Sequence, residues 1–193
     1  MVEEAHFIFI DVGLGSIEGF PLYQENLNIF KSLNPNIPVH LWNEEELDNL
    51  VMSSYKHLWT IWNSFPMPFY KIDFGRYLIL KKYGGIYIDL DMECLKPIDL
   101  DKNYVNIFID NKGNQSFNNN VIRFVNRDIY DKIIEFSINR LFSCKMPTTW
   151  KKRRLLYTVG ARMYHKFCID NKIEKTDVHD YFKDYQSKTW LKV

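Results

Sequence analysis

Short apolar runs alternate with helically spaced apolar residues through the first sixty positions. The runs at 6–10 and 39–42 have the length of buried strands. Between them, apolar residues recur near helical spacing from Pro21 to Leu33, and Asn34-Pro35 ends this helix. Strand, helix and strand in this order predict an α/β layered fold, Rossmann-like, with a mixed but largely parallel sheet flanked by helices.

The rest of the chain continues this alternation. Asn43 and Glu46 have the spacing of a helix start, and a helical pattern over 69–83 ends at Gly84-Gly85, where glycine suits a left-handed cap. The remaining expected elements are strands at 86–91 and 104–110, helices at 127–142 and 150–167, and a polar loop at 111–120 that is a flexible segment or an insertion. Since no repeat or linker interrupts the pattern, residues 1–193 are expected to form a single domain.

Two aspartates, Asp89 and Asp91, close the apolar run 86–91. Alternate side chains of a strand share a face, so both carboxylates should point the same way, with Cα atoms roughly 7 Å apart. At that distance two like charges repel by about 2 kcal/mol if the effective dielectric constant is about 20. A bound Mg²⁺ or Mn²⁺ would offset the repulsion, because hard cations prefer oxygen ligands. Alternatively, the aspartates simply end a strand in a turn.

The helix that precedes this strand carries Asp73 and Arg76. Their i, i+3 spacing places both side chains on one helix face. The helix stops at Gly84-Gly85 and feeds directly into the strand that delivers Asp89 and Asp91, so the four side chains can converge on one pocket. Arginine offers a fixed fork of donors to phosphate and hydroxyl oxygens, whereas a carboxylate accepts from sugar hydroxyls. A plain intrahelical ion pair is the alternative for Asp73 and Arg76.

The ordered sequence from Ile72 to Asp91, IDFGRYLILKKYGGIYIDLD, resembles the sugar-binding DXD region of a glycosyltransferase family. That family includes the initiating α-mannosyltransferases of yeast, capsular polysaccharide transferases and the clostridial glucosylating toxins. The resemblance implies a GT-A fold and a nucleotide-diphosphate sugar as donor. It also implies Mn²⁺ or Mg²⁺ as cofactor and transfer with retention at the anomeric carbon. The phosphate oxygen would serve as the base.

The resemblance also assigns roles to the central residues. Asp73 and Arg76 are similar to the pair that binds the donor sugar hydroxyls and the diphosphate. Asp89 is similar to the residue that touches ribose and sugar, and Asp91 to the direct metal ligand. These four residues are the predicted catalytic set, with Asp91 and Asp89 at the metal.

Further positions match the family less completely. Phe9, near the end of the first strand, stands where an aromatic ring stacks on the base; packing in the core is the alternative. Asn119 lies in Asn118-Asn119-Asn120, which resembles the asparagine-bearing strand start beyond the metal site. Thr158-Val159-Gly160 stands where relatives often have Thr-Gly-Pro, and it departs from that pattern at Val159 and Ala161.

The C-terminal segment Ser187-Lys188-Thr189-Trp190 is similar to the family's Ser/Trp ending, which closes over the diphosphate and often supplies a further metal ligand. Trp190 is the expected donor contact. His179, Asp180 and Asp184 all carry atoms suited to the further ligand.

UDP-glucose is the first expected donor and GDP-mannose the second, with a glycan or protein hydroxyl as acceptor. Two rival hypotheses remain. One is a catalytically silent sugar-nucleotide-binding module. The other is a Mg²⁺-dependent DxD phosphatase of the haloacid-dehalogenase type, whose motif usually has Thr or Val where this chain has Glu93.

Composition narrows the remaining possibilities. With 25 basic and 24 acidic residues the net charge is +1, which argues against nucleic acid as partner. The basic run 151–154 is expected to be a solvated helix face, with a phosphate or an anionic membrane surface as the alternative. Three separated cysteines favour a reducing compartment. An acidic N-terminus and the absence of a long apolar run predict a soluble cytoplasmic protein without an integral membrane segment.

Overall fold

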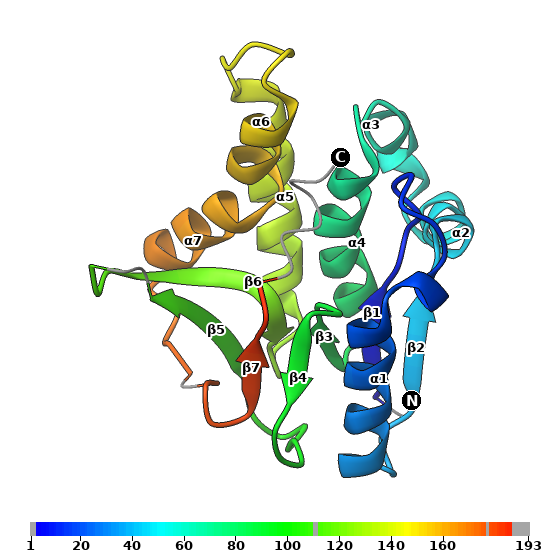
Figure 1. Ribbon diagram of the computed structural model, residues 1–193. Helices are drawn as coiled ribbons and strands as arrows, with labels where there is room; N and C mark the ends of the chain where they lie inside the picture. Colours follow the sequence, from blue (N-terminus) through cyan, green and yellow to red (C-terminus); the bar gives the residue numbers. More distant parts are fainter. Residues whose placement is uncertain (1–2, 110–111, 177, 187–193) are drawn as a thin grey trace.

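The computed structural model describes residues 3–109, 112–176 and 178–186 of the chain (Figure 1). Its strands are β1 (Ala5–Ile8), β2 (Val39–Trp42), β3 (Ile86–Ile88), β4 (Met92–Cys94), β5 (Tyr104–Ile109), β6 (Gln115–Arg123) and β7 (Phe182–Asp184). Its helices are α1 (Pro21–Leu33), α2 (Glu44–Ser54), α3 (Trp59–Asn63), α4 (Pro68–Tyr83), α5 (Asp128–Ser143), α6 (Lys151–Thr158) and α7 (Ala161–Asp170). Short 3₁₀ turns lie at η1 (Ile17–Gly19) and η2 (Lys56–Leu58).

Five strands form the central sheet in the order β2-β1-β3-β6-β5. β1 pairs in parallel with β2 and β3, whereas β6 runs antiparallel to both β3 and β5. The fold is therefore the expected α/β class with a mixed sheet, and the parallel arrangement is confined to its N-terminal half. β4 and β7 form a separate antiparallel ribbon.

Alternation along β1 supplies both faces of the sheet. Ala5 and Phe7 pack on the side of α1 and the β4–β7 ribbon. Ile8 packs on the other side, where α2, α4, α5 and α7 form a continuous apolar layer. Figure 1 shows the sheet between these two layers. In the part of the chain that the structure describes, no helix is both long enough and apolar enough to cross a membrane.

Several helix boundaries follow directly from local sequence. The predicted capping box is present: the Asn43 side chain accepts from the Glu46 amide, and the Glu46 carboxylate accepts from the Asn43 amide, both at 2.9 Å. α4 begins at Pro68, in the first turn where proline costs no hydrogen bond. It ends at Gly84, whose φ of 76° suits glycine.

Gly85 is required by packing as well as by its backbone angle. Its φ is 76°, and a Cβ atom placed on it would lie 1.9 Å from the carbonyl oxygen of Glu4. This close approach lets the Ile86 amide donate to the Glu4 carbonyl at 3.0 Å, which starts the pairing of β3 with β1. Gly84-Gly85 therefore does more than end α4, because it also sets β3 in register beside the first strand.

Three predicted elements were wrong in detail. The polar loop expected at 111–120 is largely strand, since β6 starts at Gln115 and pairs with both β3 and β5. The single helix expected at 150–167 is two helices, because Gly160 is extended, with φ −92° and ψ −160°. The strand expected at 86–91 ends at Ile88, and Asp89 begins a turn.

His6 is the one fully buried histidine among the described residues. Its Nε2 lies 3.1 Å from the Gly84 carbonyl oxygen, and its Nδ1 accepts from the Trp42 indole at 3.3 Å. One nitrogen must therefore carry the proton and the other must not, which defines a neutral ring. Burial lowers the pKa of His6 from 6.5 to about 4.

We expect this histidine to make the protein less stable in acid. The unfolded chain takes up the proton at a pKa of 6.5 and the folded chain at about 4, so its contribution is complete above 6.5 and is lost as pH falls toward 4. The free energy of unfolding should drop by about 3 kcal/mol over that window, measured by urea unfolding. The drop should shrink in His6→Leu and persist in His57→Leu, which alters an exposed ring. Equal slopes in wild type and His6→Leu would contradict this assignment.

Candidate active site

A pocket of about 430 Å³ opens beside the carboxyl ends of β1 and β3. Ligands commonly bind at such strand ends in α/β sheets, and the volume lies in the range of small-molecule sites. Among its described lining residues, those with polar side chains are Tyr23, Asp73, Arg76, Tyr87, Asp89, Asp91, Asn118, Asn119, Asn120, Asp184 and Gln186. The four predicted catalytic residues are thus brought together.

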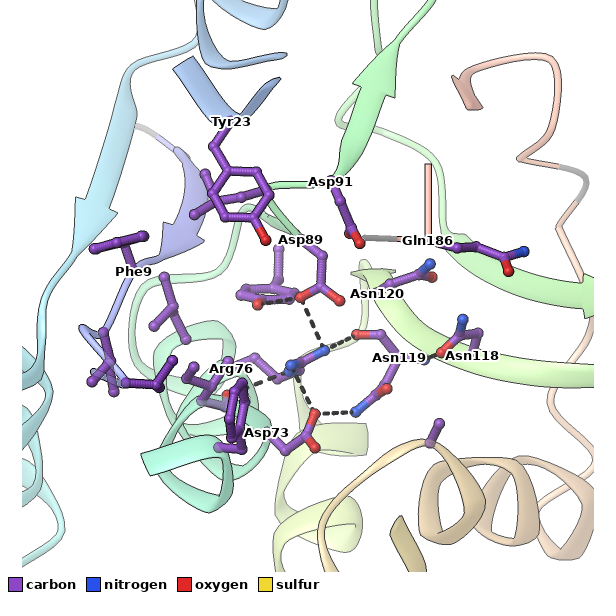
Figure 2. A pocket seen from close by; sticks show the side chains of 18 of the residues that line it. Phe9, Tyr23, Asp73, Arg76, Asp89, Asp91, Asn118, Asn119, Asn120 and Gln186 are labelled. Carbon is purple, nitrogen blue, oxygen red and sulfur yellow. Dashed lines mark hydrogen bonds and ion pairs between the residues drawn. The ribbon is translucent and has the colours of Figure 1, made fainter. Parts of the chain in front are cut away.

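Arg76 occupies the centre of this polar group (Figure 2). Its Nη2 lies 2.7 Å from Asp73 Oδ1 and its Nη1 lies 3.4 Å from Asp89 Oδ1. Nη1 also donates to the carbonyl oxygen of Asn119, and the guanidinium carbon is 4.5 Å from the centre of the Tyr87 ring. Only 3% of Arg76 is exposed. The guanidinium is therefore a fixed positive charge beneath the pocket.

Asn119 also holds Asp73, at the same carboxylate oxygen that faces Arg76. The Asn119 amide donates to Asp73 Oδ1 at 2.9 Å and to the Tyr77 hydroxyl at 3.1 Å. Burial raises the pKa of Asp73, although Arg76 and Asn119 favour its charged form. Asn119 is on β6, so a buried helix and a strand that lie far apart in sequence position this carboxylate together.

Asp89 lies between a phenol and the guanidinium. The Tyr87 hydroxyl donates to Asp89 Oδ1 at 2.6 Å, the same oxygen that faces Arg76. Burial raises the pKa of Asp89 to about 7; Arg76 opposes this increase, and the neighbouring charge of Asp91 adds to it. Because Oδ1 is already engaged, Asp89 would have its other oxygen for a ligand.

The DxD segment is a turn rather than the predicted continuous strand. The Met92 amide donates to the Asp89 carbonyl at 3.0 Å, so Asp89 to Met92 closes a four-residue turn between β3 and β4. Both carboxylates still line the pocket, and Leu90 between them is buried. Both carboxylates therefore reach one pocket, as expected. They do so from a turn, which was the alternative prediction, and not from a continuous strand.

Asp184 reaches the pocket through the β4–β7 ribbon. In this ribbon Asp184 is the register partner of Met92, the residue that follows Asp91. The Asn120 amide donates to Asp184 Oδ2 at 3.1 Å, and Asn120 itself accepts from the Asn106 amide at 2.7 Å. Burial raises the pKa of Asp184, with the charge of Asp91 contributing. Asp91 and Asp184 are therefore close enough to repel each other.

Apolar and aromatic side chains form the wall opposite this acidic group. Phe9 meets Phe20 edge to face, with ring centroids 5.7 Å apart, and Phe20 stacks on Tyr23 at 5.0 Å. The loop after β1 closes this side, because Asp11 Oδ1 accepts from the amides of Gly13 and Gly15 at 2.8 and 3.0 Å. Phe9 therefore lines the pocket and also packs on Phe20, and its stacking on a base stays a prediction.

The other candidates for the C-terminal ligand are placed less favourably. His179 is exposed and does not line the pocket in the described part of the chain. Asp180 is exposed and its carboxylate lies 3.7 Å from Lys96 Nζ. Trp190 falls outside the described residues. Of the three candidates, the structure brings only Asp184 to the site.

Sequence reasoning gave no role to Tyr87, Asn120 or Gln186, which also line the pocket. Tyr87 could have been noticed, because it sits two residues before Asp89 on the same strand face. Asn120 lies in the asparagine triplet that resembles the family's strand start, but its partners Asn106 and Asp184 come from other strands. Gln186 had no comparable signal.

The donor set fits a hard divalent cation. Asp91 and Asp184 provide carboxylate oxygens on one side of the pocket, each in a place where negative charge is crowded. No group of three or more His, Cys, Asp or Glu side chains among the described residues could hold a metal by itself. Mg²⁺ and Mn²⁺ are often bound by one or two carboxylates with phosphate oxygens completing the shell, and two carboxylates at the edge of a large pocket match that arrangement.

A solved structure described as PaToxG glycosyltransferase has the same architecture. It aligns with a TM-score of 0.59 over 88% of this chain and 69% of that chain, at 14% sequence identity. The mixed five-stranded sheet flanked by helices is therefore a GT-A type glycosyltransferase fold.

Residues 22–114 match the model of the glycosyltransferase sugar-binding region containing the DXD motif. Inositol phosphoceramide mannosyltransferase 3 of Schizosaccharomyces pombe is 24% identical over 173 residues, which cover 82% of this chain and 48% of the relative. Inositol phosphoceramide mannosyltransferase 1 of the same yeast is 39% identical over 59 residues, or 31% of this chain and 18% of the relative. Residues 22–114 of this chain thus resemble the sugar-binding region of this DXD-motif glycosyltransferase family, and the chain spans at most about half the length of these two relatives.

Gly160, at the break between α6 and α7, offers a direct test of the Asp73 position. A Cβ atom placed on it would lie 2.8 Å from Asp73 Oδ2 and 3.2 Å from the Leu156 backbone. We expect Gly160→Ala to displace the carboxylate and to lower the rate of donor turnover roughly 10²-fold. Unfolding should become easier by only about 1–3 kcal/mol. Gly19→Ala, where nothing lies within 4 Å of the new atom, is the control. Equal turnover in the two variants would show that Asp73 tolerates the displacement.

Proposed function

We propose that this protein transfers a hexose from a nucleotide-diphosphate sugar to an acceptor hydroxyl, with a divalent cation and with retention of anomeric configuration. The observation that carries the proposal is the buried Arg76, which is fixed by Asp73 and Asp89 and faces the carboxylates of Asp91 and Asp184 across one pocket. This arrangement places a rigid positive charge and a cation site around the same space.

Arg76 suits the diphosphate. Its donors are oriented before any ligand arrives, so stabilising negative charge on the leaving group requires no reorganisation. Asp73 and Asn119 present oxygen and amide groups beside it, which can bind sugar hydroxyls. The aromatic wall at Phe9 and Tyr23 would receive the base, where stacking contributes about 1–3 kcal/mol by analogy with nucleic acids.

Asp91 and Asp184 are the residues that we propose for the metal, with Asp89 adjacent. A bound Mn²⁺ or Mg²⁺ would act there as a Lewis acid toward the diphosphate. Asn120 holds Asp184 in place, and its own orientation is fixed by Asn106. Through this chain of hydrogen bonds, β5 and β6 would tune a carboxylate that sits on β7.

Retention is supported by what lines the pocket. Its described lining contains no His, Lys, Cys, Ser or Thr. Asp73 and Asp89 are each paired with Arg76 through Oδ1, and the positive charge makes both carboxylates weaker nucleophiles. Attack by the acceptor hydroxyl on the face of the departing diphosphate, with a phosphate oxygen as base, needs no such side chain.

The identity of the sugar is the least constrained part of the proposal. The names of the relatives specify mannosyl transfer, which supports mannose, so GDP-mannose stands beside UDP-glucose as the donor to test first. A glycan or protein hydroxyl is the proposed acceptor. The same names add inositol phosphoceramide to the acceptors worth testing.

The test is to incubate the protein with a panel of nucleotide sugars and Mn²⁺, and to follow the release of nucleoside diphosphate with and without a chelator. Release that requires the metal supports the transferase. Tight donor binding without release would favour a silent binding module. Release of inorganic phosphate from sugar phosphates would favour a phosphatase and contradict the proposal.

A further inference from the structure

The connection between α5 and α6 carries a strongly basic surface that the proposed active site does not use. Between Arg140 and Tyr157 the chain has no Asp or Glu, although the net charge of the whole protein is only +1. The basic residues of this stretch are Arg140, Lys145, Lys151, Lys152, Arg153 and Arg154. In Figure 1 this connection projects at the top of the molecule, away from the sheet.

Large apolar side chains are exposed at the same place. Phe142 is 75% exposed, more than any other large apolar residue in the described part of the chain, and Trp150 is 51% exposed. Scattered exposed apolar residues are normal, but an apolar cluster ringed by charge marks an interaction site. Lys145 and Trp150 also line a shallow groove here, together with Met146 and Pro147.

The cations are placed where the fold itself does not favour them. Lys151, Lys152 and Arg153 occupy the first turn of α6, which contains no acidic residue. The positive end of the helix dipole disfavours cations at this position. Arg153 is nevertheless directed to the neighbouring indole, with its guanidinium carbon 5.4 Å from the Trp150 ring centroid. Helix stability does not account for this concentration of charge, whereas a negatively charged partner would.

We propose that this basic-aromatic tip, defined by Phe142, Lys145, Trp150, Lys151, Lys152 and Arg153, docks onto the surface of an anionic lipid bilayer. Tryptophan favours the membrane–water interface, and lysine and arginine reach anionic headgroups while their stems lie against apolar groups. A nucleic acid would complement the charge but would leave the protruding Phe142 in water.

The position of the tip relative to the pocket gives the docking a consequence. α6 starts at the tip, and one turn later its residues Leu155 and Leu156 line the pocket. A protein held by the tip would therefore have this wall of the pocket close to the bilayer. If the proposed transferase activity holds, the acceptor is a hydroxyl presented at a membrane surface.

Co-sedimentation of the full chain with vesicles tests the docking. We expect binding to vesicles of phosphatidylcholine mixed with phosphatidylserine, little binding to phosphatidylcholine alone, and weakening as salt is raised. Each cation near an anionic surface contributes about fivefold to affinity, so Lys151→Glu/Lys152→Glu/Arg153→Glu should lower it at least ~100-fold. Trp150→Ala should lower it to a smaller extent. Circular dichroism should show that both variants remain folded, since Trp150, Lys151 and Arg153 are exposed and Lys152 is half-buried.

Matched controls distinguish binding through the basic-aromatic tip from a general effect of net charge. Lys31→Glu/Lys56→Glu/Lys132→Glu makes the same change in net charge at three exposed lysines elsewhere and should keep vesicle binding within a few-fold of wild type. Ile169→Ala removes an apolar side chain that is 53% exposed, close to the value for Trp150. Equal losses in the two triple variants would overturn the proposal. So would an oligonucleotide that binds the tip in preference to anionic vesicles.

The two proposals can fail independently. Release of nucleoside diphosphate from a water-soluble donor needs no vesicle, and the triple variant at 151–153 should retain it at the wild-type rate. Donor turnover without vesicle binding would overturn the docking alone. Vesicle binding without turnover of any donor would overturn the transferase alone.

Discussion

Asp91→Asn is expected to lower metal-dependent donor turnover by about 10²- to 10³-fold, the range seen when one preorganised electrostatic contact is removed from an active site. The fold should be unaffected or slightly more stable. Asp91 raises the pKa of both Asp89 and Asp184, so its charge works against the folded state. Removing it relieves a repulsion while taking a ligand from the cation. Nucleoside diphosphate release and urea unfolding, measured on the same preparation, check both parts.

Asp101→Asn is the matched control, because Asp101 is an exposed carboxylate outside the pocket. Its turnover should equal that of the wild type. Added Mn²⁺ should restore the donor turnover of Asp91→Asn only weakly, because the substitution removes the negative charge of a proposed metal ligand. Wild-type turnover in Asp91→Asn would remove this carboxylate from the mechanism. A large loss of stability would show that its role is structural.

Arg76→Met should cost both stability and turnover. The substitution keeps most of the volume but leaves Asp73 and Asp89 as buried carboxylates without their shared cation. Breaking a buried pair in this way typically costs about 3–5 kcal/mol. The penalty should grow as pH rises, because the two carboxyls then have to be buried in their charged forms. Urea unfolding across pH measures it, and donor turnover should fall at least ~10²-fold.

A double-mutant comparison isolates the cause. Arg76→Met/Asp89→Asn should recover part of the lost stability, because one uncompensated carboxylate is removed, while turnover stays low. Arg162→Met changes an exposed arginine and should alter the free energy of unfolding by less than about 0.5 kcal/mol. If the double variant is as unstable as Arg76→Met, the cost comes from packing rather than from charge.

Much of the fold was predictable where the signal is local. The capping box at Asn43, the glycine end of α4 and the strand at 39–42 all follow from neighbouring residues and are confirmed. The antiparallel half of the sheet was not predictable in the same way. β6 carries the polar residues Asn118 to Asn120, which read as a loop, but these side chains are used inside the site and the backbone pairs on both sides.

The site residues also divide into those predictable from local sequence and those that depend on distant strands. Asp73, Arg76, Asp89 and Asp91 lie within one ordered segment, so sequence could name them together. The partners that orient them come from distant strands: Asn119 binds Asp73, and Asn120 binds Asp184. No spacing rule links residues 46 or 64 positions apart, as these pairs are.

By itself, the sequence determined the α/β class, the helix that carries Asp73 and Arg76, and the acid pair that follows it, because periodicity and caps act over a few residues. Only the tertiary structure decided that Asp89 and Asp91 lie in a turn and that Arg76 is buried between two carboxylates. It also decided that Asp184 meets them across a ribbon of two short strands. Desolvation and long-range strand pairing control these features, and both depend on residues that become neighbours only when the chain has folded.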